Sequence, residues 1–408
     1  MTLLKRAAAR PVTIWSRPFV FIFVINLIIS MAQFMMNTLV PKLAESLGAT
    51  AVVVGVVSGI FAVTALSVRP GVGPASVRFR KQHLLAATVG VLLLAFLIYA
   101  IADSIEMIIV ARLLHGAGMG LLAPVTLALA SDALPESRMA SGIGIFSLGQ
   151  AASTAIGPSI GLALLAHIGY QATFLCGAAV MGMALLLALR VKAVEYDAPP
   201  NRGFSWRTFV APEAIVPAVV IFFLAGAYSG VNTFVVLYGD SLGIAEIGLF
   251  FTAYAVFVLI SRPAAGRIAD RFGLTTVIVP GMILFAVAFV VLSYARTLTG
   301  VLIAGAISAF GYGVCQPAIQ TLSLTSVDKP RRAVAGNTNY IGVDLGYLVM
   351  PIIAGWVVSS VHADGATMAD SYAVMYRVMV IPVVIGLVLY LVFGRSQRRT
   401  PVSQEPME

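Results

Sequence analysis

Three ionisable side chains lie inside long apolar stretches of this chain, where a charge is costly and usually has a function. Asp344 is the only acidic residue deep in such a stretch, about ten residues or roughly 15 Å from its end if the stretch is helical. A desolvated carboxyl group can take up and release a proton. It can also bind a cationic substrate group, and the structural alternative is an internal ion pair or helix cap.

Arg112 and His115 lie one helical turn apart in a second apolar stretch. An arginine at the centre of a membrane helix costs about 2.5–3.5 kcal/mol on insertion scales, so it needs a partner or a wet cavity. The alternative is that Arg112 extends to the nearby membrane surface. His115 can titrate near neutral pH, or it can be a hydrogen-bonded structural residue. Together with Asp344, these two residues are our candidates for proton coupling.

The elements that must position these residues are twelve apolar segments. Hydrophobic residues make up 60% of the chain and charged residues 11%, against about a quarter charged in soluble domains. Most segments are long enough to cross about 30 Å of hydrocarbon as a helix. We therefore predict an all-α integral membrane protein with transmembrane helices near residues 18–40, 51–68, 83–102, 105–130, 140–166, 171–190, 214–237, 247–261, 275–294, 300–324, 334–360 and 373–394.

The second half of the sequence repeats the first at an offset of 193 residues. The offset aligns Gly, Pro and Arg at nine positions, among them Pro70 with Pro263 and Gly118 with Gly311. A duplicated six-helix unit is a common architecture of transporters. We predict two pseudo-symmetric six-helix halves, 1–190 and 214–394, a cytoplasmic linker over 191–213 and a disordered cytoplasmic tail over 395–408.

The net charge of +9 is distributed asymmetrically along the chain. If the N-terminus is inside, cytoplasmic segments hold 22 of the 26 Lys and Arg residues, and external loops hold only Lys42, Arg296 and Arg377. This asymmetry follows the positive-inside rule. It places both termini in the cytoplasm of a multi-pass protein of the cell inner (plasma) membrane, and it leaves no basic surface that would indicate a nucleic-acid partner.

Polar residues form stripes on particular segments at helical spacing, and such stripes must face protein or water rather than lipid. Stripes on several symmetry-related helices favour a shared substrate cavity, and the alternative is hydrogen bonding between helices. The candidate cavity residues are Asn26, Gln33, Asn37, Gln150, Tyr228, Asn232, Tyr312, Gln316, Gln320, Asn337 and Tyr340.

Two related segments with glycines, prolines and arginines follow the second and eighth predicted helices. The second copy contains Gly266, Asp270 and Arg271, and the first contains Gly73 and Arg78 but has Val77 in place of the acid. Together they resemble the cytoplasmic signature loop of the major facilitator superfamily, which implies the major facilitator fold. In that family the loop helps to latch the two halves, so we expect these five residues to form a gating loop. Without the acid at position 77, either the latch is weaker or Asp270 dominates it.

Two further motifs resemble the proton-coupled drug and sugar efflux branch of this superfamily. Arg112 and Gly118 belong to an Arg-x-x-x-Gly-x-Gly pattern. In the fifth predicted helix, Gly149, Gly157, Pro158 and Gly161 resemble the antiporter motif of drug–proton antiporters, although the spacing is one residue short. Glycines allow close helix packing and proline bends a helix, so a structural role is expected as well.

From these observations we predict a secondary active transporter that exports a small drug-like, sugar or metabolite molecule by proton-coupled alternating access. An uptake carrier or a lipid or metabolite transporter of the same fold is the alternative, and a membrane receptor or enzyme is the prediction from a different class. The chain has no Gly-rich Lys-Ser/Thr loop and no metal-ligand cluster within its spans. We therefore expect no enzymatic activity, cofactor or metal, and a monomer whose partners are its substrate, protons and the lipid bilayer.

Overall fold

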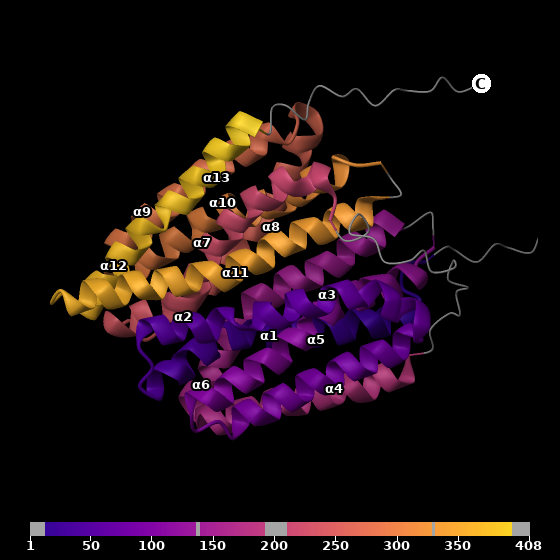
Figure 1. Cartoon of the computed structure of the whole chain (residues 1–408), viewed down its shortest axis with the longest axis horizontal. Helices are drawn as coiled ribbons and strands as arrows, with labels where there is room; N and C mark the ends of the chain where they lie inside the picture. Colours follow the sequence, from indigo (N-terminus) through magenta and orange to yellow (C-terminus); the bar gives the residue numbers. More distant parts are fainter. Residues whose placement is uncertain (1–12, 136–138, 192–209, 329–330, 394–408) are drawn as a thin grey trace, which may run out of the picture.

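The computed structural model describes residues 13–135, 139–191, 210–328 and 331–393, and its regular elements within these ranges are all helices (Figure 1). A short 3-10 turn over Pro212–Ala214 precedes α7. The α-helices are α1 (Arg17–Ser46), α2 (Ala51–Gly59), α3 (Phe61–Arg78), α4 (Lys81–Ala100), α5 (Ile105–Asp132), α6 (Met139–Arg190), α7 (Ile215–Ser241), α8 (Leu249–Phe272), α9 (Thr275–Tyr294), α10 (Leu298–Thr325), α11 (Arg332–Ala363), α12 (Met368–Val378) and α13 (Val380–Phe393).

These helices account for the twelve predicted membrane crossings. Eleven are long and apolar enough to span a membrane, if α2 with α3 and α12 with α13 are each counted as one. One of the eleven, over Ala152–Arg190, has 39 residues, or about 58 Å as a continuous helix, which is about twice the hydrocarbon thickness. It is interrupted at Gly169, whose φ of 73° and ψ of 178° are not helical. The predicted fifth and sixth spans therefore meet at this glycine.

Capping residues at the helix starts follow the internal repeat. The hydroxyl of Ser104 accepts from the Met107 N–H at the start of α5, and the hydroxyl of Thr297 accepts from the Gly300 N–H at the start of α10. Ser104 and Thr297 are themselves 193 residues apart. Each cap satisfies a backbone donor that lipid cannot, so the duplication preserved the end of the helix as well as its packing.

Several helix ends differ from the prediction because the helices continue beyond the apolar segments. The expected gating loop is helical: Gly73 and Arg78 lie in α3, and Gly266, Asp270 and Arg271 lie in the last turns of α8. A helix satisfies its own backbone hydrogen bonds and needs no apolar environment to continue into water.

Residues with external loop positions in the prediction also lie on helices. Lys42 is in the final turns of α1, and Arg377 is in α12. The predicted linker and tail fall largely outside the described residues.

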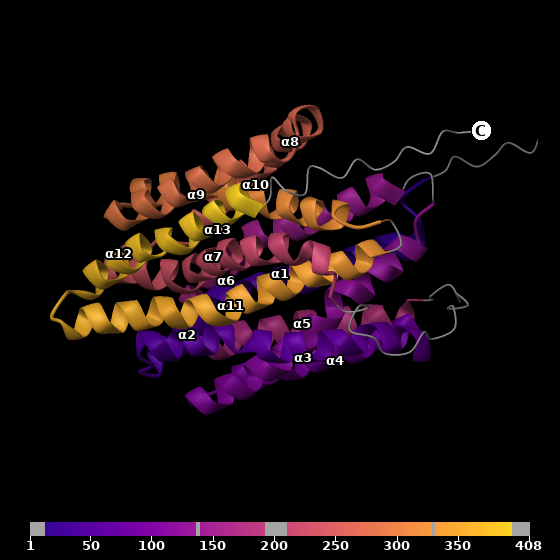
Figure 2. The same cartoon turned by 45° about the horizontal axis from the view of Figure 1, so that its top comes forward.

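Helices α1–α6 lie on one side of the molecule and α7–α13 on the other, as Figure 1 shows. In the turned view of Figure 2, α3 and α4 lie at the lower edge and α8 and α9 at the upper edge. Glycines let helices approach closely within a half. A Cβ at Gly342 of α11 would clash with the Ala218 carbonyl of α7. Gly157 of α6 lies similarly against α1, with the Met31 oxygen 2.7 Å from the position of an added Cβ. We call α1–α6 the N half and α7–α13 the C half.

The halves meet closely at the end of the bundle where α2 begins and α11 ends. A Cβ at Gly55 would clash with the Pro351 carbonyl, and one at Gly355 would clash with the Ala51 carbonyl. The Ser159 hydroxyl of α6 donates to the Gly248 carbonyl beside α8 at 3.1 Å. We call this end the closed end.

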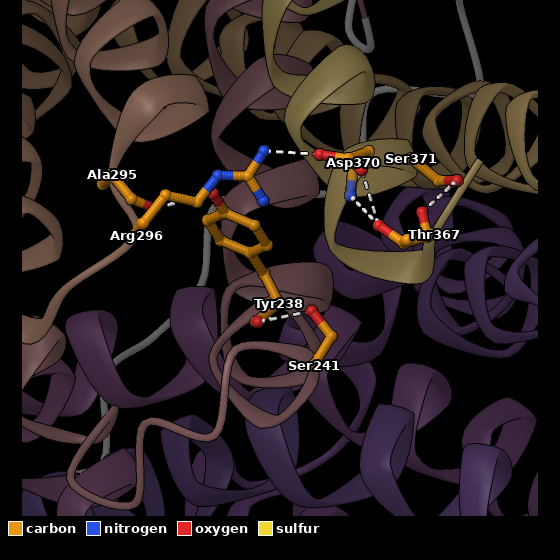
Figure 3. A network of polar contacts seen from close by, with 7 residues as sticks. All are labelled: Tyr238, Ser241, Ala295, Arg296, Thr367, Asp370 and Ser371. Carbon is orange, nitrogen blue, oxygen red and sulfur yellow. Dashed lines mark hydrogen bonds and ion pairs between the residues drawn. The ribbon is translucent and has the colours of Figure 1, made fainter.

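Charged side chains also connect elements at the closed end. Nζ of Lys42 lies 2.5 Å from Oδ2 of Asp240, which joins α1 to α7 across the halves. Within the C half, Arg296 donates to Asp370 at 2.6 Å and the Tyr238 hydroxyl donates to the Ala295 carbonyl at 2.7 Å (Figure 3). These contacts tie α7 and α12 to the connection between α9 and α10.

Candidate functional site

An ion pair between the two halves contains the aspartate that the sequence singled out. Nε of Arg69 on α3 donates to Oδ2 of Asp344 on α11 at 2.6 Å, and each side chain is 10% exposed. Asp344 is twelve residues from the start of α11, or about 18 Å along the helix axis. The pair therefore joins the halves deep in the bundle, where opposite charges attract more strongly than in water.

The strength of the ion pair between Arg69 and Asp344 depends on whether Asp344 is ionised. The guanidinium carbon of Arg69 lies 5.1 Å from the centroid of the Tyr340 ring, which adds a cation–π contact. Among the described residues, Asp344 is the carboxylate paired with Arg69. Protonation of Asp344 would cancel one charge and leave the other uncompensated. Breaking a buried pair in this way typically costs about 3–5 kcal/mol. A proton at Asp344 would thus weaken a contact between the halves.

Four aromatic residues of the C half form what we call the tyrosine cluster, Tyr228, Tyr254, Tyr312 and Tyr347. The rings of Tyr228 and Tyr312 stack with centroids 4.1 Å apart, and Tyr254 lies 5.4 Å from Tyr228. The Asn232 amide donates to the Tyr347 hydroxyl at 3.3 Å. The structure therefore brings three predicted cavity residues, on α7 and α10, into one group.

Other predicted cavity residues of the C half lie along α10 and α11. The Gln320 amide donates to the Tyr340 hydroxyl at 3.5 Å. Oε1 of Gln316 accepts from Nη2 of Arg262 at 3.4 Å. Asn337 is half-buried in the first turns of α11. These side chains continue the polar surface that begins at the tyrosine cluster.

The predicted residues of the N half are more dispersed. His115 hydrogen bonds through Nε2 to Oε1 of Gln33, and the Tyr99 hydroxyl lies 3.4 Å from its Nδ1. An amide oxygen accepts, so this arrangement fits a neutral imidazole with its proton on Nε2. Asn26 is buried, Asn37 is half-buried and Gln150 is exposed. His115 and Gln33 are thus engaged with each other inside the N half.

Arg112 does not extend to the membrane surface, because its residue is only 2% exposed. Its guanidinium donates to the carbonyls of Val57 at 2.9 Å and Ser58 at 2.5 Å, at the point where α2 ends before α3 begins. A cation at a helix C-terminus satisfies free carbonyls and the negative end of the helix dipole. The guanidinium carbon also lies 4.6 Å from the centroid of Phe61.

The C half has no equivalent of this arginine. The position related to Arg112 by the repeat is Gly305, and α8 runs from Leu249 to Phe272 as one helix where the N half has two. Phe61 in turn lies edge-on to Tyr347 across the halves, with centroids 6.4 Å apart. Arg112 therefore supports a break in the membrane helix beside the contact between the halves.

We expect Arg112→Leu to destabilise the protein and to slow transport. The carbonyls of Val57 and Ser58 would lose their donors, and each unsatisfied buried polar group costs about 1–3 kcal/mol. Thermal unfolding of the purified protein and initial transport rates would measure both effects. Arg112→Lys keeps the charge without the forked geometry and should retain part of the stability. Unchanged unfolding and transport in Arg112→Leu would contradict this role.

The expected gating residues make few contacts in this conformation. Asp270 is exposed and makes no hydrogen bond or ion pair with any described residue. Arg271 lies over the ring of its neighbour Phe272 at 5.2 Å. The side chain of Arg78 lies outside the described set. A latch formed by Asp270 stays a prediction. Among the described residues, Arg69 is the cation that joins the halves at depth.

The glycines of the antiporter-like motif serve close packing of α6 on α1. A Cβ at Gly149 would lie 2.9 Å from the Phe23 ring, and one at Gly161 would clash with Met35. Gly157 also lines a cavity of 290 Å³ between α1 and α6, with an apolar lining of Ile28, Met31, Ala32, Met35, Ile160, Leu164, Cys176, Gly177, Val180 and Met183. These contacts show the expected structural role of the motif, which is close packing of the two helices.

Two functional candidates were missed from the sequence, Arg69 and Arg262. They are related by the same step of 193 residues and belong to the two copies of the signature segment. From the sequence alone, both arginines belong to the cytoplasmic charges that set the orientation. One sequence feature could have identified them: each precedes the glycine of its motif by four residues, or one helical turn. Side chains on a helix tilt toward its N-terminus, so both arginines point back toward the membrane interior.

The profile of the Major Facilitator Superfamily matches residues 22–245 and 218–408 of this chain. Together the two matches cover both halves, so the chain belongs to the Major Facilitator Superfamily. The family and the named relatives that the chain matches are membrane transporters and not enzymes.

The relatives of this chain include an export protein and a multidrug resistance protein. The chain is 26% identical over 257 residues to a Staphylopine export protein of Staphylococcus aureus, and the match covers 60% of this chain and 64% of that protein. The match thus spans just under two thirds of this relative's length. The chain is 22% identical over 348 residues to Multidrug resistance protein MdtG of Enterobacter lignolyticus, covering 82% of this chain and 80% of the relative.

The overall architecture is also shared with solved transporters. A bacterial homologue of the human lysosomal transporter Spinster, in an inward-facing and occupied conformation, superposes with a TM-score of 0.80 at 15% identity. The superposition covers 94% of this chain and 98% of the other. At this level of identity the likeness concerns the fold.

Proposed function

We propose that this transporter exports a small molecule across the cell inner membrane in exchange for protons, and that Asp344 is the coupling group. The ion pair between Arg69 and Asp344 carries the proposal, because it connects the halves at depth and depends on the charge of one titratable residue. The names of the relatives, a Staphylopine export protein and a multidrug resistance protein, support the outward direction.

In the proposed cycle the described conformation is the one closed toward the outside. The asymmetry of Lys and Arg favours cytoplasmic termini, which assigns the closed end of Lys42 and Asp240 to the external side. Ionised Asp344 stabilises this conformation through Arg69. When the halves rock to open the external side, Asp344 takes up a proton from outside, and this weakens its contact with Arg69. Proton entry and cargo exit therefore alternate at one site.

Transport by purified protein in liposomes tests this proposal. Counterflow of a ligand found by a thermal-shift screen should occur without a gradient, and an imposed pH gradient should drive net accumulation toward the more acidic compartment. Accumulation that follows the proton into the same compartment would instead show cotransport. A ligand that binds tightly and shows no counterflow would contradict the proposed transport cycle.

A further inference from the structure

Arg262 is a deeply placed cation that has no anionic partner among the described residues. Its Nε donates to the Gly313 carbonyl at 3.0 Å and its Nη2 donates to Gln316, and no described carboxylate lies within ion-pair distance. Gly313 is twelve residues from the end of α10, or about 18 Å along the helix. This is the depth that Asp344 has in α11, so the guanidinium of Arg262 lies at the level of the ion pair.

Comparison of the two halves shows that the missing acid is specific to Arg262. The repeat relates Arg262 to Arg69, Gln316 to Ala123 and Ala151 to Asp344. The N-half arginine has Ala123 in the place of that glutamine and is neutralised by Asp344 of the other half. The C-half arginine has a neutral acceptor beside it and no acid at the symmetric position. One of the two equivalent charges is therefore compensated and the other is not.

The side chain of Arg262 has unused hydrogen-bonding capacity. A guanidinium group has five N–H donors, and two of them are used by Gly313 and Gln316. The residue is half-buried. Lipid offers no acceptor for the remaining donors, so the exposed part of Arg262 must face water or a ligand. Planar donors of this kind match a carboxylate in bidentate geometry.

An aromatic wall adjoins this charge. A Cβ at Gly313, the residue that holds Arg262, would lie 3.4 Å from the Tyr254 hydroxyl. Tyr254 belongs to the tyrosine cluster, in which Tyr228 and Tyr312 stack. A cation beside flat aromatic faces and phenol hydroxyls suits a ligand with a carboxylate and a planar or ring-shaped body.

We propose that Arg262 is the anion-binding residue of the transport site and that the cargo is an organic carboxylate. This inference rests on the proposed function, because it takes the surface between the halves as the place where cargo binds. It adds a substrate class that the relatives' names do not give. It also assigns different tasks to two arginines related by duplication: Arg69 pairs with Asp344 and Arg262 pairs with cargo.

Ligands that share an aromatic body but differ in the charge of the attached group test the proposal on the purified full-length protein. The probes are indole-3-acetate, indole-3-acetamide and tryptamine, with benzoate, benzamide and benzylamine as a smaller set. We expect the two acids to raise the unfolding temperature more than their amides and amines. In Arg262→Gln, titration should show the acids binding about 10- to 100-fold more weakly, the usual loss for a charge-assisted contact. Amide binding should be unchanged.

Two variants separate anion binding from other effects of the substitution. Arg262→Lys keeps the charge and should retain part of the preference for acids. Arg267→Gln removes an exposed charge from the same helix and should leave the preference intact. The inference is wrong if acids stabilise the parent no better than amides, or if Arg262→Gln responds to acids as the parent does.

Counterflow of the acids in liposomes distinguishes this failure from failure of the proposed function. Transport of amides or amines with no preference for acids would overturn the role of Arg262 alone. Arg262-dependent binding of acids without any counterflow would keep the anion site and overturn the proposed transport cycle.

Discussion

Replacing Asp344 by Asn should abolish accumulation driven by a pH gradient while leaving counterflow measurable. Asn has nearly the same shape and its amide oxygen can still accept from Nε of Arg69, which lies 2.6 Å from Oδ2 of Asp344. The Asn side chain cannot take up or release a proton, so a pH gradient can no longer change the contact between the halves. We expect gradient-driven accumulation to fall to the level of protein-free liposomes.

A structural role for the ion pair makes a different prediction, and a double variant distinguishes the two. Asp344→Asn leaves Arg69 as an uncompensated buried charge, which typically costs about 3–5 kcal/mol. Adding Arg69→Gln removes that charge and should recover much of the thermal stability. If the pair only holds the halves together, the double variant should also recover gradient-driven transport. If Asp344 is the coupling group, stability returns and coupling does not.

The sequence predicted the helices well because lipid imposes a simple rule on them. A crossing segment must be long, apolar and internally hydrogen bonded, and the runs around residues 83–102 and 275–294 became α4 and α9 with ends shifted by two residues or fewer. The repeat of 193 residues also predicted the fold class, which the family match confirms. Ends that extend into water, as in α8, carry no such signal and were underestimated.

The candidate site was only partly predictable, because its contacts join residues that are far apart in the chain. Asp344 was identified from its rarity as a buried acid, but its partner Arg69 is 275 positions away and was taken for a surface charge. The break between α2 and α3 was not predicted, because the arginine that supports it, Arg112, belongs to a different helix. Pairings of this kind depend on helix packing and rotation, which periodicity alone does not determine.

The second large effect is expected at the closed end, where two glycines let α2 and α11 touch. An added Cβ at Gly55 would lie 2.7 Å from the Pro351 carbonyl carbon and 3.0 Å from the Ile352 Cα, and Gly355 is placed similarly against Ala51. These neighbours are backbone atoms and cannot rotate away. Overpacking of this kind costs about 1–3 kcal/mol, and the cost falls only on the conformation in which this end is closed.

We therefore expect Gly55→Ala and Gly355→Ala to shift the protein toward the conformation that is open at this end. A cost of about 1–3 kcal/mol changes the ratio of two states by roughly 5- to 150-fold.

Spin labels at Ala49→Cys and Ala245→Cys, in the loops after α1 and α7, would report the separation of the halves once Cys176 and Cys315 are replaced by Ser. The distance distribution should move to longer values, and transport should slow because closure is disfavoured. Gly90→Ala on α4 is the matched control, since an added Cβ there has no neighbour within 4 Å. A distribution in Gly55→Ala that matches both the parent and this control would show that the approach of α2 to α11 does not limit closure.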